Sequence, residues 1–517
     1  MAKNFFITSP IYYPSGKPHI GTAYTTILTD VIFKYKKLIG YNAYFLTGLD
    51  EHGQKIEEKA KQEGFSSPQE YVDKMVHYFT DLWKKINIDY SQFIRTSNDF
   101  HVSSVQKIFS KMYKNGDIYL GEWKGLYCVG CEEPYTLAEA IKKEDGLYCR
   151  VGHKLSQRTE PSYFFKISKY NEWIKTYFEE HQDFIFPVSR THEMLNNFID
   201  KGLDDLSISR TNFTWGIQIE ENKSHVIYVW LDALFNYVTA LGYLQENDIL
   251  FKEFWQNQNS QVVHIVGKDI ARFHTIFWPI MLHSLNLRIP SKVISHSFIM
   301  AEDGRKMSKS FGNVIDPEEI VNEHGSDIFR YYLMKEFILD SDNCFSKKKY
   351  IEIFNSDLAN LYGNIVTRTI GMIKLYNGGK VSLANNIFTK ELDEMINKKA
   401  LLLAKVEEEI ENFNIKEVLN IVNNYAKEIN QFIENFKPWE VKKTNDIDLL
   451  NNFLFILTDA VRTITVLLSP VLCEGFLKIS KMMNFSDEML TFSSLKDVNL
   501  IEGLKVNEAS AIYLRIK

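Results

Sequence analysis

Short apolar runs alternate with amphipathic helical patterns along the first part of the chain. Residues 5–8 and 41–47 predict strands, and the apolar periodicity of residues 21–38 predicts a helix between them. A strand, a helix and a second strand in this order are typical of a parallel βαβ unit. We therefore expect the residues up to about 113 to form one half of a doubly wound parallel sheet.

The pattern changes twice further along the chain. Residues 114–224 are irregular, and strand-then-helix patterns return at residues 225–230 and 262–266. After about residue 346 the strand patterns disappear, and long helical periodicity follows, as in residues 450–468. This order predicts a split α/β sheet with an insertion between its halves, followed by an α-helical domain.

Composition narrows the class of protein. The 517 residues are 45% hydrophobic, which suits two to four domains, and no apolar stretch reaches the roughly 18 residues that a membrane span needs. The start of the chain leaves no room for a signal peptide, and five cysteines fit the reducing cytoplasm. The net charge of −6 excludes a generally basic nucleic-acid coat. The lysine runs at 347–349 and 442–443 remain candidate local contacts, or solvated faces.

Two short motifs, far apart in the chain, suggest phosphate chemistry. Residues 18–22 (Pro-His-Ile-Gly-Thr) open the first predicted helix, whose N-terminus attracts anions. His19 could donate to a phosphate there, or could simply cap the helix. Residues 306–310 (Lys-Met-Ser-Lys-Ser) offer two lysines and two hydroxyls to polyphosphate charge. In this order, the two motifs resemble the ATP-handling motifs of class I aminoacyl-tRNA synthetases.

Three cysteines and a histidine in the insertion have the spacing of a zinc knuckle. Cys128 and Cys131 form a Cys-x-x-Cys pair, and Cys149 and His153 follow after a short loop. Three thiolates and an imidazole satisfy tetrahedral zinc, although either pair alone could be buried core cysteines. Because all four positions are filled, we expect a structural metal rather than a catalytic one.

A carboxylate and two aromatic segments follow predicted strands, where open α/β sheets bind ligands. Asp50 ends the apolar run 44–49 and could hold an ammonium group, or could cap the next helix. The aromatic segments are residues 228–237 and 267–278. A pocket of Trp, Tyr, Ile and His suits a thioether side chain, because sulfur contacts aromatic rings well. The alternative is ordinary core packing.

Several motifs together resemble methionyl-tRNA synthetases of the bacterial type with a single zinc knuckle. They are residues 10–13, 18–21, 49–53, 228–233, 267–270 and 306–310. The resemblance implies a split Rossmann-like doubly wound parallel sheet with an inserted zinc-knuckle domain, followed by an α-helical bundle domain. The implied domains are the first Rossmann half (1–113), the connective insertion (114–224), the second Rossmann half (225–290), a stem-contact region with the lysine loop (291–345), and an anticodon-binding helical domain with a C-terminal tail (346–517).

The resemblance also implies partners and site residues. The partners would be ATP with magnesium, L-methionine, and tRNA at its acceptor end and anticodon, with structural zinc in a cytoplasmic monomer. Methionine would be bound by Tyr13, Asp50, Trp230, Ala233, Tyr237, Ile270 and His274. ATP would be bound by His19, Gly21, Thr22, Asp269, Lys306, Ser308 and Lys309, with His19, Lys306 and Lys309 catalytic. The anticodon would be read by Asn364, Arg368 and Trp439, and the metal would be held by Cys128, Cys131, Cys149 and His153.

One position departs from the family. Its first motif normally ends in a second histidine, where this chain has Thr22. A threonine can donate one hydrogen bond to a phosphate but carries no charge, and losing a charge-assisted donor costs about 10²–10³ in rate. A non-catalytic tRNA-binding paralogue is therefore an alternative, as are a cysteine-specific class I synthetase and, further off, a small-molecule adenylyltransferase. The short insertion disfavours isoleucine, valine and leucine enzymes, which need an editing domain.

Overall fold

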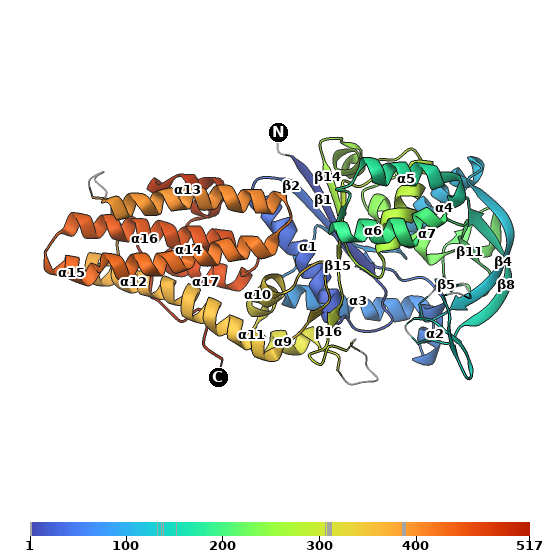
Figure 1. Cartoon of the computed structure of the whole chain (residues 1–517), viewed down its shortest axis with the longest axis horizontal. Coiled ribbons are helices and arrows are strands. Elements are labelled where there is room, and N and C mark those ends of the chain that lie inside the picture. The colour runs from blue at the N-terminus through green and yellow to red at the C-terminus, as the bar shows by residue number, and fades with distance from the viewer. Residues whose placement is uncertain are drawn as a thin grey trace.

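The structure, a computed structural model, describes residues 3–131, 133–135, 137, 139–150, 152–305, 307, 313–384 and 389–516. The described part forms an elongated molecule with an α/β half and a helical bundle (Figure 1).

A six-stranded parallel sheet organises the α/β half. Its order is β3-β2-β1-β14-β15-β9, from β3 (Gln92–Arg95), β2 (Asn42–Leu49), β1 (Asn4–Tyr12), β14 (Gln261–Gly267), β15 (Lys292–His296) and β9 (Ile185–Phe186). This confirms the predicted doubly wound sheet. The chain runs from β1 to β2 on one side, and from β14 to β15 on the other. In sheets of this kind a ligand is therefore expected at the carboxyl ends of β1 and β14.

The sheet separates two hydrophobic cores. Side chains alternate along β1, so that Phe5 and Ile7 face one core and Phe6 faces the other. The first core continues into the helical bundle through α1 (Ile20–Leu38), which is buried on nearly all sides. The second core is covered by α4 (Asp99–Lys114), α7 (Val229–Thr239) and α8 (Trp278–Ser284). Helices α2 (Gln54–Gln62) and α3 (Pro68–Lys85) follow β2.

The range 114–224 contains a long antiparallel ribbon of β4 (Ile118–Cys128) and β8 (Ser156–Phe165). The ribbon's sheet is completed by β5 (Glu133–Tyr135) and β10 (Leu206–Ser207). Near its tip β6 (Ile141–Lys143) pairs with β7 (Gly146–Tyr148). Helices α5 (Asn171–Glu180) and α6 (Val188–Asn197) flank β9, so this range also supplies an edge strand to the central sheet.

One predicted strand lies in a different sheet from the one expected. Residues 225–230 were expected to resume the parallel α/β pattern. Instead β13 (Asn222–Ile227) is antiparallel, in a small sheet with β11 (Ser209–Arg210) and β12 (Gln218–Ile219), and α7 begins at Val229. The physical reason is that a run of alternating or apolar residues specifies a strand but not its partner. Strand direction is decided by distant pairing.

The helical bundle follows a connecting segment. That segment contains β16 (Ile299–Met300), α9 (Pro317–His324), α10 (Ser326–Glu336) and β17 (Asn343–Cys344). The bundle contains α11 (Lys347–Ile353), α12 (Asn364–Asn377), α13 (Lys390–Glu411), α14 (Ile415–Phe436), α15 (Pro438–Lys443), α16 (Ile447–Leu468) and α17 (Cys473–Met483). The predicted helical domain is therefore present.

Helix α16 is the exception to the expected lack of long apolar stretches. Within the described residues it alone has the length and mean hydropathy, 1.3, of a membrane span. However, 89% of that window is buried inside the protein. Helices α12, α13, α14, α15 and α17 pack against it (Figure 1), as expected for the core helix of a bundle.

Arg330 of α10 joins the two halves of the molecule. Its buried guanidinium donates to the Asp30 carboxylate of α1 at 2.6 Å and to the carbonyl oxygen of Ile86 at 3.0 Å. It also donates to the carbonyl oxygens of Pro470 and Val471, after α16, at 2.7 and 3.1 Å. A single side chain thus ties α1 of the α/β half to the end of the central bundle helix.

Replacing Arg330 by methionine is expected to lower the free energy of unfolding by about 3 kcal/mol, because a buried carboxylate and several buried carbonyls lose their donor. The expected loss of unfolding free energy is at the low end of the range for a broken buried ion pair, because Lys34 still contacts Asp30 at 2.8 Å. Denaturant titration measures it. Lys175→Met, which breaks an exposed pair with Asp200, is the control and should leave the midpoint unchanged. Equal midpoints for the two variants would contradict the assigned role.

Lys36 forms a second joint between the halves. Its side chain is fully buried, and its Nζ lies 2.5 Å from Glu411 at the end of α13. The ammonium also lies 5.3, 4.6 and 5.0 Å from the ring centroids of Phe5, Tyr41 and Phe413. These rings offer cation–π contacts that partly replace water around the charge. The bundle is therefore packed directly against the first strand and helix of the sheet.

Candidate functional site

His19 caps the N-terminus of α1. Its backbone is extended (φ −114°, ψ 175°), and its Nδ1 accepts hydrogen bonds from the N–H groups of Gly21 at 3.0 Å and Thr22 at 3.4 Å. An accepting Nδ1 places the ring proton on Nε2. The exposed imidazole can therefore cap the helix and donate from Nε2 to an anion at the same time. The two interpretations of His19 are compatible.

Gly21 and Thr22 pack closely behind this ring. A Cβ at Gly21 would lie 2.9 Å from His19 Cε1, so any side chain there would displace the imidazole. Only 8% of Thr22 is exposed, and its carbonyl accepts hydrogen bonds from the hydroxyls of Tyr12 and Thr26 at 3.4 and 3.0 Å. Thr22 thus offers little surface to a phosphate in front of α1.

Strand β15 brings the chain that leads to the lysine loop beside α1. His296, the last residue of β15, meets Thr25 Oγ1 through Nε2 at 2.7 Å, and its ring contacts Tyr24 edge-on. Lys306, Ser308 and Lys309 of the loop itself lie outside the described residues. Asp269 is exposed just after β14, at the same edge of the sheet.

Asp50 follows β2 directly at the carboxyl edge of the sheet. Its N–H donates to the carbonyl of Tyr12, the last residue of β1, at 2.9 Å. Burial raises the pKa of Tyr237, and the negative charge of Asp50 raises it further. The half-buried Asp50 carboxylate therefore lies within electrostatic range of Tyr237, and a carboxylate in this place can pair with an ammonium group.

A hydrogen-bond chain joins three residues of the predicted methionine pocket, Tyr237, His274 and Ile270. His274 Nδ1 lies 3.0 Å from the carbonyl of Ile270, so this nitrogen must carry the proton. His274 Nε2 then accepts from the Tyr237 hydroxyl at 2.7 Å. Burial lowers the pKa of His274 to about 4, so the imidazole is neutral at neutral pH. A neutral, internally satisfied pair presents ring surface rather than charge, which suits a thioether.

The remaining predicted pocket residues lie on the same two segments or close to the start of the chain. Trp230, in the first turn of α7, stacks on Phe273 with ring centroids 3.6 Å apart. Ala233 follows one turn later and is 6% exposed. Tyr13, just after β1, has the Lys55 ammonium 5.5 Å from its ring centroid. Because α7 carries Trp230, Ala233 and Tyr237 at helical spacing, these three share one face.

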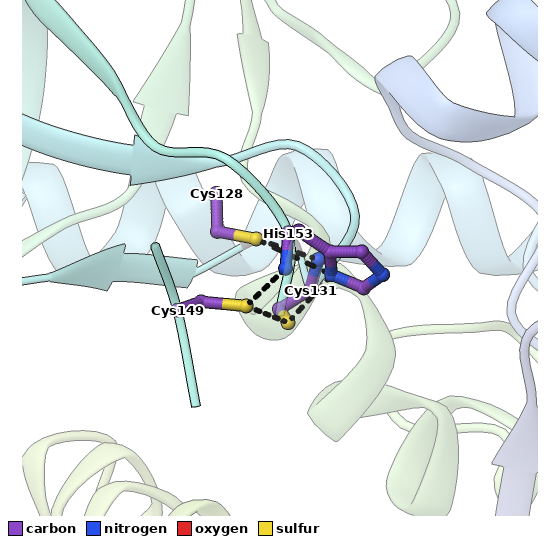
Figure 2. A group of neighbouring side chains, drawn as sticks. All are labelled: Cys128, Cys131, Cys149 and His153. Atoms are coloured by element: carbon purple, nitrogen blue, oxygen red, sulfur yellow. Dashed lines mark hydrogen bonds between the residues drawn. The ribbon is translucent and has the colours of Figure 1, made fainter. Parts of the chain in front are cut away.

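The four predicted metal ligands converge at the tip of the insertion (Figure 2). Their ligand atoms all lie within 4.8 Å of one another. Cys131 Sγ is 3.7 Å from Cys149 Sγ and 3.4 Å from His153 Nδ1, and Cys128 Sγ is 3.6 Å from that nitrogen. Tetrahedral zinc with Zn–S bonds of about 2.3 Å separates its sulfur ligands by about 3.8 Å. The donor set and the spacing therefore fit a tetrahedral metal.

The local backbone prepares the cluster for a metal. The N–H groups of Cys131 and His153 donate to the Sγ atoms of Cys128 and Cys149 at 3.3 and 3.2 Å. Hydrogen bonds from Cys131 hold the pKa of Cys128 down to about 5, which favours the thiolate that metals bind. A Cβ at Gly130 would lie 2.5 Å from His153 Nδ1, so only glycine leaves room for the imidazole.

The knuckle touches the segment that follows Asp50. Lys55 of α2 donates from Nζ to the carbonyl of Gly130 at 3.1 Å, and Arg158 of β8 donates to the Gln54 side chain at 3.2 Å. Helix α2 begins at Gln54, a short distance after Asp50 in sequence. A change in the knuckle can therefore move the loop that carries the predicted ammonium-binding carboxylate.

The predicted anticodon residues lie in the helical bundle. Asn364 is exposed at the start of α12, and Arg368 follows one turn later, pairing with Glu434 of α14 at 2.7 Å. Trp439 is 39% exposed in α15, which directly follows α14. Helix α15 lies at the end of the bundle farthest from the sheet (Figure 1). An exposed tryptophan at such an end can stack on an unpaired base.

Sequence reasoning assigned no role to several side chains that support the site. Asp232 and His52 stand in recognised motifs, but their mutual contact joins positions 180 residues apart. The Glu51 carboxylate is held by Arg95 at 2.7 Å, again from a distant segment. No local pattern shows such pairs. The only available signal was that ionisable residues occupy otherwise apolar motifs.

Comparisons with known proteins agree with this geometry. The family model described as "tRNA synthetases class I (M)" matches residues 5–144 and 146–370. The methionine–tRNA ligase of Ureaplasma parvum is 48% identical over 518 residues, covering 99% of this chain and 98% of the relative. That of Clostridium perfringens is 45% identical over 518 residues, covering 99% of this chain and 78% of the relative.

A solved structure is also similar over the whole chain. Mycobacterium tuberculosis methionyl-tRNA synthetase in complex with methionyl-adenylate aligns with a TM-score of 0.94 at 31% identity, covering 99% of this chain and 100% of that one. The family model, the full-length relatives and the shared fold converge. This chain belongs to the class I tRNA synthetase family, in its methionyl branch.

Proposed function

We propose that this chain is a methionine–tRNA ligase that joins L-methionine to tRNA in an ATP-dependent reaction through methionyl-adenylate. The observation that carries the proposal is the gathering of His19, Asp50 and the Tyr237–His274 pair at one edge of the sheet. The full-length similarity to a synthetase bound to methionyl-adenylate supports it independently.

In the first step the methionine carboxylate attacks the α-phosphorus of ATP, and pyrophosphate leaves. Asp50 pairs with the ammonium, while Trp230, Ala233, Ile270 and the neutral Tyr237–His274 pair surround the thioether. His19 Nε2 donates to phosphate oxygens at the N-terminus of α1. Lys306 and Lys309 stabilise the charge that develops on the phosphates, and magnesium bound to ATP would share in that neutralisation.

In the second step the terminal ribose hydroxyl of tRNA attacks the activated carbonyl of the adenylate, the acyl–phosphate bond breaks, and AMP leaves as the methionyl ester forms. Positioning supplies most of the acceleration, and we assign no general base. In the bundle, Trp439 stacks on an anticodon base while Asn364 and Arg368 contact base edges. To contact a base, Arg368 must give up its ion pair with Glu434, whose carboxylate lies 2.7 Å from the guanidinium.

Cys128, Cys131, Cys149 and His153 would hold zinc, which supplies a structural crosslink at the tip of the insertion and takes no part in the chemistry. The chain would act as a cytoplasmic monomer. None of the five cysteines is in a disulfide, which supports a reducing compartment.

The decisive experiment is amino-acid-dependent ATP–pyrophosphate exchange, followed by charging of tRNA. We expect exchange with methionine and none with cysteine at equal concentration. Exchange with cysteine alone would support the cysteine-specific alternative. The absence of exchange with any amino acid, together with retained tRNA binding, would support the non-catalytic paralogue and overturn the proposal.

The Thr22→His variant is expected to raise the rate of adenylate formation by about 10²-fold without changing methionine affinity, because it restores a charge-assisted donor beside the phosphates. The gain is placed at the low end because the Thr22 side chain is mostly buried. The rate of adenylate formation is measured under single-turnover conditions. Thr22→Asn is the uncharged control. An equal or lower rate for the histidine variant would contradict the prediction that Thr22 weakens adenylate formation.

A further inference from the structure

A buried carboxylate lies behind the methionine pocket and contacts no predicted substrate atom. Asp232, in α7, is 0% exposed. Its Oδ2 lies 2.7 Å from His52 Nδ1, and its Oδ1 lies 2.7 Å from His101 Nε2. A carboxylate can only accept, so both histidine nitrogens carry protons. Burial raises the pKa of Asp232, but His52 and His101 outweigh it, so the pKa is lowered overall and the group is ionised.

The two histidines belong to different parts of the site. His52 follows Asp50 in the loop after β2, and its ring packs edge-on against Trp215 at 5.2 Å. The Trp215 indole N–H donates to the Glu51 carbonyl at 2.5 Å, which fixes the same loop from its other side. This segment carries the predicted ammonium-binding carboxylate. Its position therefore depends on the bond between His52 and Asp232.

His101 contacts the other carboxylate oxygen of Asp232. It lies in α4, is fully buried, and its Nδ1 meets Thr239 Oγ1 at the end of α7 at 2.6 Å. His101 therefore contacts α7 at both Asp232 and Thr239, two turns apart. Helix α7 is held along its length against α4.

Asp232 lies on a different face of α7 from the predicted pocket residues. At about 100° per residue, Trp230, Ala233 and Tyr237 fall on one face of α7, and Asp232 falls about 120° or more away from that face's centre. The carboxylate thus holds the helix from behind. A shift of α7 on α4, or of the Asp50 loop on α7, would change the distance between the thioether pocket and the ammonium-binding group.

We infer that Asp232 is a positioning residue that holds the pocket face of α7 in register with the Asp50 loop and thereby sets the affinity for methionine. This rests on the proposed function, because it assumes that methionine spans the two elements. The two histidines that contact Asp232 belong to the loop after β2 and to α4, and neither belongs to the phosphate-binding end of α1. The effect should therefore be confined to the amino acid.

The test is methionine-dependent ATP–pyrophosphate exchange by the full chain carrying Asp232→Asn. We expect the KM for methionine to rise about tenfold, with the KM for ATP unchanged, because one charge-assisted hydrogen bond is lost. A merely structural role predicts a lower folded fraction, which reduces kcat and leaves both KM values alone. An unchanged methionine KM, or an equal rise in both KM values, would overturn the inference.

A matched control is available in the bundle. Asp459 is also buried between two partners, with Lys399 Nζ at 2.6 Å and Arg462 Nη2 at 2.9 Å, but it lies far from the sheet's carboxyl edge. Asp459→Asn should lower the melting temperature and leave the methionine KM unchanged. A rise in methionine KM equal to that of Asp232→Asn would show that the effect is general destabilisation and would overturn the inference.

A second pair of variants covers the case in which Asp232→Asn fails to fold. In His52→Asn the amide nitrogen stands near the position of Nδ1 and can still donate to Asp232, whereas His52→Leu cannot donate. We expect a near-parental methionine KM for the asparagine variant and about a tenfold rise for leucine. Equal KM values for the two variants would overturn the inference. If the parent protein itself shows no exchange with methionine, the proposed function has failed instead.

Discussion

Removal of zinc is expected to unfold the tip of the insertion while the central sheet stays folded. The tip has a small core of its own, consisting of Leu126, Cys128, Tyr135, Cys149 and Leu155. So small a core cannot offset the entropy of ordering the surrounding loops. In isolated zinc-binding peptides the metal contributes about 10–16 kcal/mol, so its loss should outweigh every other change considered for this region.

Metal analysis of the purified protein should give one zinc per chain. After chelation, or in Cys131→Ser, amide hydrogen exchange of the residues around the cluster should become fast, and added zinc should restore protection only in the parent. The methionine KM should rise as well, since Lys55 of α2 bonds to the carbonyl of Gly130 in the knuckle. The exposed Cys344 provides the control, and Cys344→Ser should change none of these quantities. Full protection without metal would contradict the assignment.

Asp50→Asn is expected to reduce kcat/KM for methionine by about 10³-fold. The half-buried carboxylate is assigned to the substrate ammonium, and truncating one partner of such a pair costs about 2–5 kcal/mol, with 1.4 kcal/mol for each factor of ten. The side chain keeps its size, so the hydrogen bond from its N–H to Tyr12 and the sheet should be unaffected.

Steady-state pyrophosphate exchange with methionine and ATP varied separately checks this prediction. The loss should appear with methionine as the varied substrate, and the melting temperature should stay near that of the parent. Asp269→Asn is the reciprocal variant, because Asp269 is exposed after β14 and assigned to ATP, so it should raise the KM for ATP instead. Identical kinetic profiles for the two variants would mean that the carboxylates are not divided between the substrates in this way.

The first strand–helix–strand unit of the sheet was predictable because its strands and helix follow from local patterns. The apolar run 5–8, the helical periodicity of 21–38 and the run 41–47 became β1, α1 and β2, although β1 extends beyond the predicted run to Tyr12. The metal cluster was predictable for a similar reason. Two close ligand pairs limit the geometry strongly, and the four ligand atoms lie together in the structure.

Other features could not be predicted from sequence because they depend on partners far along the chain. The run 225–230 did not reveal that β13 would be antiparallel, and β9 gave no sign that it would extend the central sheet. Both outcomes depend on which strand lies alongside, and a local run carries no record of its neighbour.

The sequence by itself determined the α/β class, the helical bundle, the ligand set of the knuckle and the residues at strand ends where a substrate would bind. Only the tertiary structure decided the proton positions on His19 and His274, the Asp232 contact with His52 and His101, and the Arg330 joint between the two halves. The physical reason is the distance along the chain over which each feature is determined. Periodicity and ligand spacing act over a few residues, whereas hydrogen-bond partners of buried polar groups are chosen by packing across the whole molecule.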